Sequence, residues 1–229
     1  MRILAIDTSC GAASVAVVEG GVAEPLAVMS RPMARGHAEA LAPMVEEVMR
    51  GLDGGFGSLS RIAVATGPGS FTGIRVGLAM ARAMAVALGI PVVGVSTLAA
   101  FAAPLLSAPR PGIIAAAIDA RHGSVYFQLF EPSGRPLGPP RCDTARECVR
   151  AIGAGPAWLA GDAAAILASE AQRAGLPYDL GAATDAPDIV ALAWMGLAVD
   201  AASNPARPIY AKAPDARPNP AEPVARAPA

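Results

Sequence analysis

The sequence predicts an α/β protein of two lobes related by duplication, and three observations support this prediction. An apolar strand that ends at Asp7 leads into a second strand, and the same order recurs where residues 113–119 lead into 124–130. Each copy then continues into a strand, a tight turn and a helix, at 64–67 and again at 159–162. The chain has 229 residues, 53% hydrophobic and 16% charged, so it can bury two cores.

The first lobe is expected to begin with three strands and a helix. Residues 3–6 and 14–18 are short apolar runs on either side of a turn-rich segment, which is typical of a β-hairpin, and residues 22–30 extend it as a third strand. From residue 36 to 52 the apolar residues recur at helical spacing, and the glycine-rich segment 51–57 ends this helix.

Two strand-and-helix pairs complete the first lobe. Strands are predicted at 61–66 and 91–95, and each leads into a helix, at 72–88 and 96–106. Gly89 ends the longer helix.

Two prolines and a glycine in residues 107–112 predict the boundary between the lobes, which we place at 1–108 and 109–203. The second lobe is expected to contain strands at 113–118, 124–130 and 157–160 and helices at 143–152, 163–174 and 187–202. Residues 204–229 form a tail whose seven prolines disfavour helix and sheet. We expect residues 208–210 to pack on the body and the chain beyond about Asp215 to be disordered.

Composition excludes several classes of protein. A net charge of −1 gives no global cationic field for nucleic acid. Three cysteines without metal spacing indicate reduced thiols and a cytoplasmic protein. The longest apolar stretch, residues 74–88, contains two arginines and is shorter than the roughly 20 residues of a membrane span, so we expect no membrane partner.

The two hairpin turns are the candidate nucleotide site. A strand that ends in Asp and a small hydroxyl turn can present amides and hydroxyls to phosphate, while the Asp holds hydrated Mg²⁺. Asp7, Thr8 and Ser9 form the first such turn and Asp119 begins the second. Facing turns of this kind are the layout of the actin-like ATPase, sugar kinase and chaperone superfamily, with its duplicated ribonuclease H-like fold. The second turn carries Arg121 and His122, which leave little room for a nucleotide, and the alternative is that both aspartates cap their turns.

The segment 67–73, Gly-Pro-Gly-Ser-Phe-Thr-Gly, opens a helix that is apolar almost all round. It lacks the Gly-Lys-Ser/Thr order of a P-loop, and its simplest interpretation is a tight connection capped by Ser70 or Thr72. Gly73, Gly77 and Ala81 form a smooth stripe where another helix can approach. Six of the eight methionines lie between residues 29 and 84, which is typical either of an adaptable binding surface or of core filling.

The sequence lacks the residue patterns of a metal site and of a catalytic nucleophile. His37 and His122 are the only histidines, and they do not stand at the spacing of zinc ligands. No Gly-x-Ser-x-Gly elbow occurs, and the single lysine, Lys212, lies in the tail. We therefore predict no catalytic residue and no metal site.

Four motifs together resemble the TsaB (YeaZ) family. They are Ile-Leu-Ala-Ile-Asp-Thr-Ser at 3–9, Arg-Gly-His-Ala-Glu at 35–39, the glycine loop extended to Gly77, and Gly-Val-Ser-Thr-Leu at 94–98. Asp119-Ala120-Arg121 and Pro208-Ile209-Tyr210 also suit this family, although Lys212 replaces its usual arginine. The resemblance covers most of residues 1–130.

The resemblance implies a two-lobed actin-like fold and a subunit without chemistry of its own. TsaB proteins are inactive relatives of the metal-bearing TsaD. With TsaD and the ATPase TsaE they form the bacterial complex that transfers a threonylcarbamoyl group to a tRNA adenosine next to the anticodon, in tRNAs that read codons beginning with A. The chain would meet tRNA indirectly, have no intrinsic cofactor, and leave ATP or ADP with Mg²⁺ to the complex interface.

The resemblance also places the TsaD contact on the helices 36–52 and 72–88. The expected partner-binding residues are Leu41, Met44, Val45, Val48, Gly73, Val76, Gly77, Met80, Ala81 and Met84. Alone, the chain would use the same helices as a homodimer. The main alternative is a stand-alone nucleotide-binding kinase or ATPase of the same fold, distinguished by Mg·ATP affinity that Asp7→Ala abolishes. A metallopeptidase would need a bound transition metal.

Overall fold

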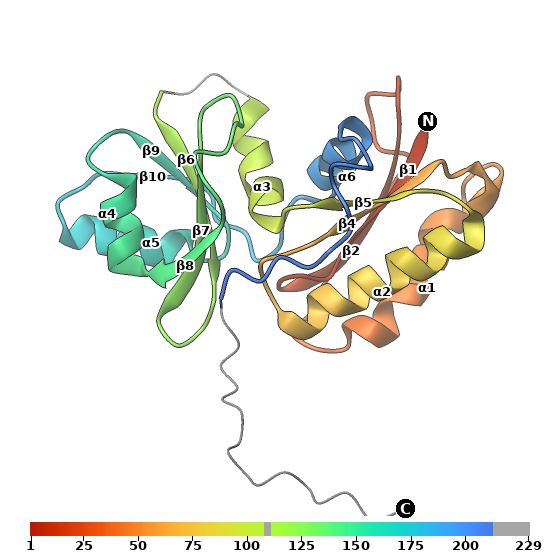
Figure 1. Cartoon of the computed structure of the whole chain (residues 1–229), viewed down its shortest axis with the longest axis horizontal. Coiled ribbons are helices and arrows are strands. Elements are labelled where there is room, and N and C mark those ends of the chain that lie inside the picture. Colours follow the sequence, from red (N-terminus) through yellow and green to blue (C-terminus); the bar gives the residue numbers. More distant parts are fainter. Residues whose placement is uncertain (108–110, 213–229) are drawn as a thin grey trace, which may run out of the picture.

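Two lobes, each built on a five-stranded mixed sheet, make up the computed structural model, which describes residues 1–107 and 111–212 (Figure 1). The strand order is β3-β2-β1-β4-β5 in the first sheet and β10-β9-β6-β7-β8 in the second. In each sheet the first strand of the lobe, β1 or β6, is central. The second and third strands of the lobe lie on one side of it and the fourth and fifth on the other, so the two orders are the same. The predicted duplicated α/β fold is therefore confirmed.

The first sheet consists of a meander and two parallel strands. β1 (Arg2–Asp7), β2 (Ala12–Glu19) and β3 (Ala27–Pro32) are antiparallel, and β4 (Arg61–Ala65) and β5 (Val92–Val95) run parallel to β1. We had expected the third strand at 22–30. It starts later because residues 20–26 form a turn, with the Val22 amide bonded to the Glu19 carbonyl before pairing begins at Ala27.

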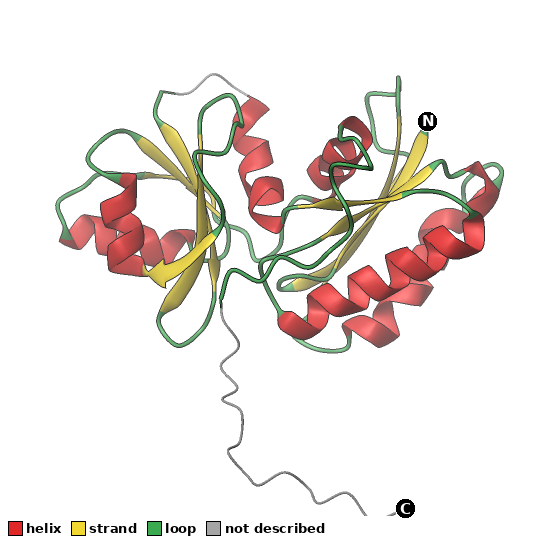
Figure 2. Ribbon diagram, in the orientation of Figure 1, coloured by secondary structure: helices red, strands yellow, loops and turns green. Residues whose placement is uncertain are grey.

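Two helices cover the outer face of the first sheet (Figure 2). They are α1 (His37–Arg50) and α2 (Phe71–Leu88), and a short 3₁₀ helix at Gly55–Ser58 follows α1. α2 begins at Ser70, whose hydroxyl accepts a hydrogen bond from the Gly73 amide, and ends at Gly89, whose φ of 65° stops the helix. Both predicted helices are confirmed.

The second lobe repeats the order of the first. Its elements are β6 (Ile113–Asp119), β7 (Ser124–Phe130), β8 (Arg141–Thr144), α4 (Ala145–Ile152), β9 (Ala157–Ala160), α5 (Ala164–Arg173) and β10 (Asp179–Ala182). We did not predict β8 or β10, which have four residues each and no apolar alternation. The predicted helix at 143–152 begins at Ala145, because Thr144 and Glu147 form a capping box there.

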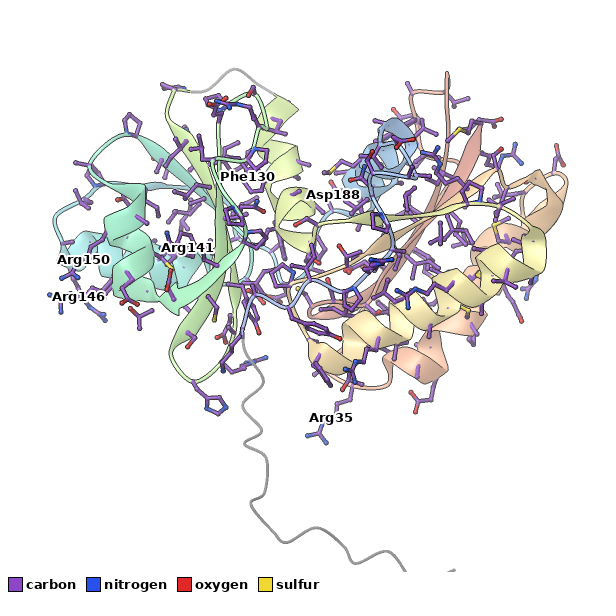
Figure 3. All side chains as sticks on the ribbon, viewed as in Figure 1. Arg35, Phe130, Arg141, Arg146, Arg150 and Asp188 are labelled. Atoms are coloured by element: carbon purple, nitrogen blue, oxygen red, sulfur yellow. The ribbon has the colours of Figure 1, made fainter. Side chains whose placement is uncertain are left out.

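The third helix of each lobe covers the other lobe's sheet. α3 (Thr97–Ala102), continued by the 3₁₀ helix Ala103–Ser107, packs on β6 with Leu98 and Phe101 buried. α6 (Ile189–Ala198) packs on β1, β2 and β4, and it begins at Asp188, whose carboxylate accepts from the Val190 and Ala191 amides (Figure 3). The helix predicted at 187–202 is thus shorter. The predicted division into 1–108 and 109–203 follows the order of the chain, but α3 and α6 each pack on the sheet of the other lobe. Residues 108–110 lie outside the described residues.

The end of the described chain runs as a strap over the first lobe. Pro205 makes an antiparallel bridge to Val93, and the Ile209 amide donates to the Thr66 carbonyl. The expected packing of residues 208–210 on the body is confirmed. The expected disorder beyond about Asp215 concerns residues outside the described part of the chain.

Candidate functional site

A cleft of about 730 Å³ lies between the lobes at the carboxyl ends of β1 and β6. The first lobe contributes Ser9, His37 and the start of α2, and the second contributes Asp119, Arg121 and Asp162. This is where the fold brings the two predicted turns together.

The first turn is buried and closed on itself. The Asp7 Oδ1 atom accepts hydrogen bonds from the Ser9 amide at 2.9 Å and the Ser9 hydroxyl at 2.5 Å. The Asp7 Oδ2 atom is buried and has no partner among the described residues. Burial raises the pKa of Asp7 to about 6, although the hydrogen bonds from Ser9 and the nearby His37 oppose the rise.

Other donors of this turn also bond to the protein itself. The Thr8 hydroxyl donates to the Gly73 carbonyl at 2.6 Å, and the Gly11 amide donates to the Asp185 carbonyl at 2.9 Å. The Ser9 carbonyl accepts from the Ser70 amide at 2.7 Å. A phosphate would have to displace these bonds, because the amides of Ser9 and Gly11 are already occupied.

The second turn is also occupied. Asp119 Oδ1 accepts from the Arg121 amide, and the Asp119 amide donates to Asp162 Oδ1, both at 2.8 Å. Burial raises the pKa of Asp162. Arg121 and His122 adopt left-handed φ angles of 64° and 52°, which place two large side chains at the turn. A nucleotide phosphate would therefore meet donors that are already bonded to the protein and two large side chains at the second turn.

The stripe of small residues on α2 faces the chain's own core, which corrects our expectation that a second helix packs there. A Cβ atom added to Gly73 would lie 2.0 Å from the Thr8 carbonyl oxygen, and one added to Gly77 would lie 2.8 Å from the Thr8 hydroxyl. Ala81 is fully buried. The glycines allow α2 to pack closely on the turn after β1.

The other expected partner residues divide into two groups. Four are buried in the same core between the helices and the sheet, namely Leu41, Met44, Val45 and Val48. Three are half-buried on α2 and pack against the edge of this core, namely Val76, Met80 and Met84. Only the second group could take part in a contact without unfolding the lobe.

Of the residues on the solvent-facing side of α2, only Val76 was among the predicted partner contacts. This docking face consists of Thr72, Val76, Ala79, Ala83, Val86 and Ala87. It carries no charge over the length of the helix, and Val86 is 85% exposed. These positions are spaced three or four residues apart, so they lie on one side of the helix, and this apolar periodicity can be read from the sequence. Three of the other predicted residues of α2, Gly73, Gly77 and Ala81, lie on its buried side.

Known proteins resemble this chain in both sequence and fold. A family model described as "TsaD: tRNA N6-adenosine threonylcarbamoyltransferase" matches residues 21–193. A solved structure, YeaZ from Pseudomonas aeruginosa, superposes with a TM-score of 0.73 at 30% identity, covering 91% of this chain and 99% of that one.

The chain belongs to the TsaB (YeaZ) family.

Two named TsaB proteins show the same relationship over a shorter length. The tRNA threonylcarbamoyladenosine biosynthesis protein TsaB of Escherichia coli is 35% identical over 131 residues, which are 57% of this chain and 55% of that protein. The TsaB protein of Bacillus subtilis is 35% identical over 133 residues, 57% and 56% of the two chains. These alignments span little more than half the length of the curated relatives. The predicted family is confirmed.

Two further properties of this TsaB chain bear on the predictions. Among residues 1–107 and 111–212, no three His, Cys, Asp or Glu side chains are grouped so that they could hold a metal ion. Within the same ranges α2, with 18 residues and a mean hydropathy of 1.4, is the one helix long and apolar enough to cross a membrane. Core helices of soluble proteins have the same properties, and α2 packs on β4 and α1. That no membrane is involved stays a prediction.

Proposed function

We propose that this chain is a non-catalytic scaffold subunit in tRNA threonylcarbamoyladenosine biosynthesis, which binds and supports a TsaD subunit. That subunit would transfer the threonylcarbamoyl group to N6 of the adenosine next to the anticodon. The observation that carries the proposal is the docking face of α2 in a chain whose family members are named for this pathway.

The docking face fits a protein partner. An uncharged, exposed face along a helix of 18 residues loses little hydration when a second apolar helix covers it. The alanines at 79 and 83 permit a close approach, and Val86 supplies apolar contact, with the half-buried Met80 beside this face as an adaptable neighbour. Without its partner, the chain would pair the same face with a second copy.

The remaining partners follow from the same role. We propose that TsaE joins the complex and that ATP or ADP with Mg²⁺ is held at a subunit junction. The turns at Asp7 and Asp119 support this, because several of the donors that could hold a phosphate are already bonded within this chain.

The experiment is co-purification with TsaD from the same organism. We expect Ala83→Arg to abolish the complex, because an unpaired guanidinium would be buried against an apolar surface. The matched control is Ala151→Arg, an exposed alanine on α4 of the other lobe, which should leave the complex intact. Full recovery of the complex with Ala83→Arg would show that α2 is not the contact.

The alternative function, a stand-alone kinase or ATPase, rests on the volume of the cleft and its carboxylates. Equilibrium titration of the isolated chain with Mg·ATP decides between the two. The proposal expects no binding that depends on Asp7, whereas micromolar affinity lost in Asp7→Ala would favour the kinase.

A further inference from the structure

An aromatic cluster lies where the strap reaches the start of α2. The rings of Phe71 and Tyr210 have centroids 5.9 Å apart, and the Arg75 guanidinium lies 3.6 Å from the centroid of Phe71. Phe71 and Tyr210 are 57% and 53% exposed, although their rings are among the largest apolar groups of the chain. Large rings held together at the surface are available for stacking.

The strap holds Tyr210 in place by contacts along its length. Arg82 donates through Nε and Nη2 to the Ala206 carbonyl, and Arg75 lies 3.4 Å from the Tyr210 hydroxyl. Two glycines make room for the strap, since a Cβ atom on Gly94 would lie 2.7 Å from the Pro205 carbonyl oxygen and one on Gly67 3.2 Å from that of Ile209. The cluster is therefore ordered before any ligand arrives.

The charges around the cluster are positive and unmatched. Arg35, Arg75 and Arg82 form no ion pair with a carboxylate in residues 1–107 and 111–212. Arg35 points away from the body below the start of α2 (Figure 3), and its neighbours Ala34 and His37 line the cleft with Phe71. Inside the cleft, three aspartates (Asp119, Asp162 and Asp185) lie beside one arginine, Arg121, which pairs with Asp119, so the cleft attracts phosphate less than the rim does. An anionic chain would thus follow the rim.

We propose that Phe71, Tyr210 and Arg75 form a stacking platform for an unpaired base of single-stranded RNA, with Arg35 and Arg75 facing the adjacent phosphates. Single-stranded RNA is recognised by stacking on aromatic rings and guanidinium planes beside cations, which is what this rim offers. The proposal rests on the proposed function, in which the RNA is a tRNA. It adds that this chain touches the RNA directly.

A protein partner explains the cluster less well. The docking face already offers a protein partner an uncharged surface on α2, which Arg75 and Arg82 border without belonging to it. A protein that covered Arg75 and Arg82 would need a carboxylate opposite each of them. An RNA strand carries a negatively charged phosphate at every nucleotide.

The test is fluorescence anisotropy of the full chain, alone and in the complex with its partner, with an RNA hairpin whose loop bases are unpaired. We expect the double variant Phe71→Leu/Tyr210→Leu to bind roughly fivefold or more weakly, because each base stack contributes strongly to affinity. The matched control is Phe56→Leu, another exposed aromatic, which should bind as the parent does. Arg75→Gln should lower the salt dependence of log K by about 0.7, and Arg146→Gln on α4 should not.

The outcomes separate this inference from the proposed function. Equal binding by the double variant and by Phe56→Leu would overturn the platform, as would equal affinity for the hairpin and for its stem as a plain duplex. If the double variant loses the TsaD complex but keeps RNA affinity, the cluster is a protein contact and the inference fails while the scaffold role stands. Should the double variant fold poorly, the surface variant Arg75→Gln decides instead, and an unchanged salt dependence of RNA binding would overturn the platform.

Discussion

Replacing Gly73 by Ala tests the packing of α2 on the turn after β1. Helix propensity alone favours alanine by about 1 kcal/mol. The new Cβ, however, would lie 2.0 Å from the Thr8 carbonyl oxygen, and Thr8 is 1% exposed, so neither side can move freely. Overpacking costs about 1–3 kcal/mol. Displacing the helix also weakens the hydrogen bond from Thr8 to Gly73 and the Ser70 cap, each worth about 1 kcal/mol.

These contributions give a net loss of about 2–4 kcal/mol in the free energy of unfolding. For a chain of this size the melting temperature should fall by roughly 10 °C, measured by circular dichroism. The control is Ala83→Gly on the exposed side of the same helix, which should lose only about 1 kcal/mol. An unchanged or higher melting temperature for Gly73→Ala would refute the close packing and would restore the glycine stripe as an open surface.

Two further predictions concern the cleft and the strap. Because the folded pKa of Asp7, about 6, lies above its usual value of 3.8, the folded state binds more protons between these values and loses about 3 kcal/mol of stability as pH rises from about 4 to 6. Asp7→Asn should therefore be more stable than the parent in urea at pH 8 and similar to it near pH 4, and lower stability at pH 8 would contradict the unpaired buried carboxylate. Arg82→Ala removes the bonds to the Ala206 carbonyl, so hydrogen exchange at the Ile209 amide should accelerate with little change in the melting temperature. Unchanged protection of Ile209 would show that Arg82 does not fasten the strap.

Local patterns in the sequence were sufficient to predict most of the fold. The runs that end at Asp7 and Asp119 lie on β1 and β6, the central strands of the two sheets, and their shared order revealed the duplication. The short strands β8 and β10 escaped prediction because pairing with a neighbour, not apolar alternation, defines them. The exchange of α3 and α6 between the sheets was also hidden, since chain order does not say which sheet a helix covers.

The candidate site was predicted in part. The turns at Asp7 and Asp119 do face one cleft, yet only the structure shows that the amides of Ser9 and Arg121 are bonded to the aspartates of their own turns. The stripe of Gly73 and Gly77 correctly indicated a close approach by another part of a protein. A sequence cannot say whether that part is a second protein or, as here, the chain's own turn at Thr8.

The most direct test of the scaffold role is the threonylcarbamoyladenosine content of tRNA in cells depleted of this chain and supplied with variants. Mass spectrometry of tRNA nucleosides should show the modification restored by the parent and by Ala151→Arg but not by Ala83→Arg, at equal protein levels. Normal modification in the depleted cells, or full restoration by Ala83→Arg, would contradict the account.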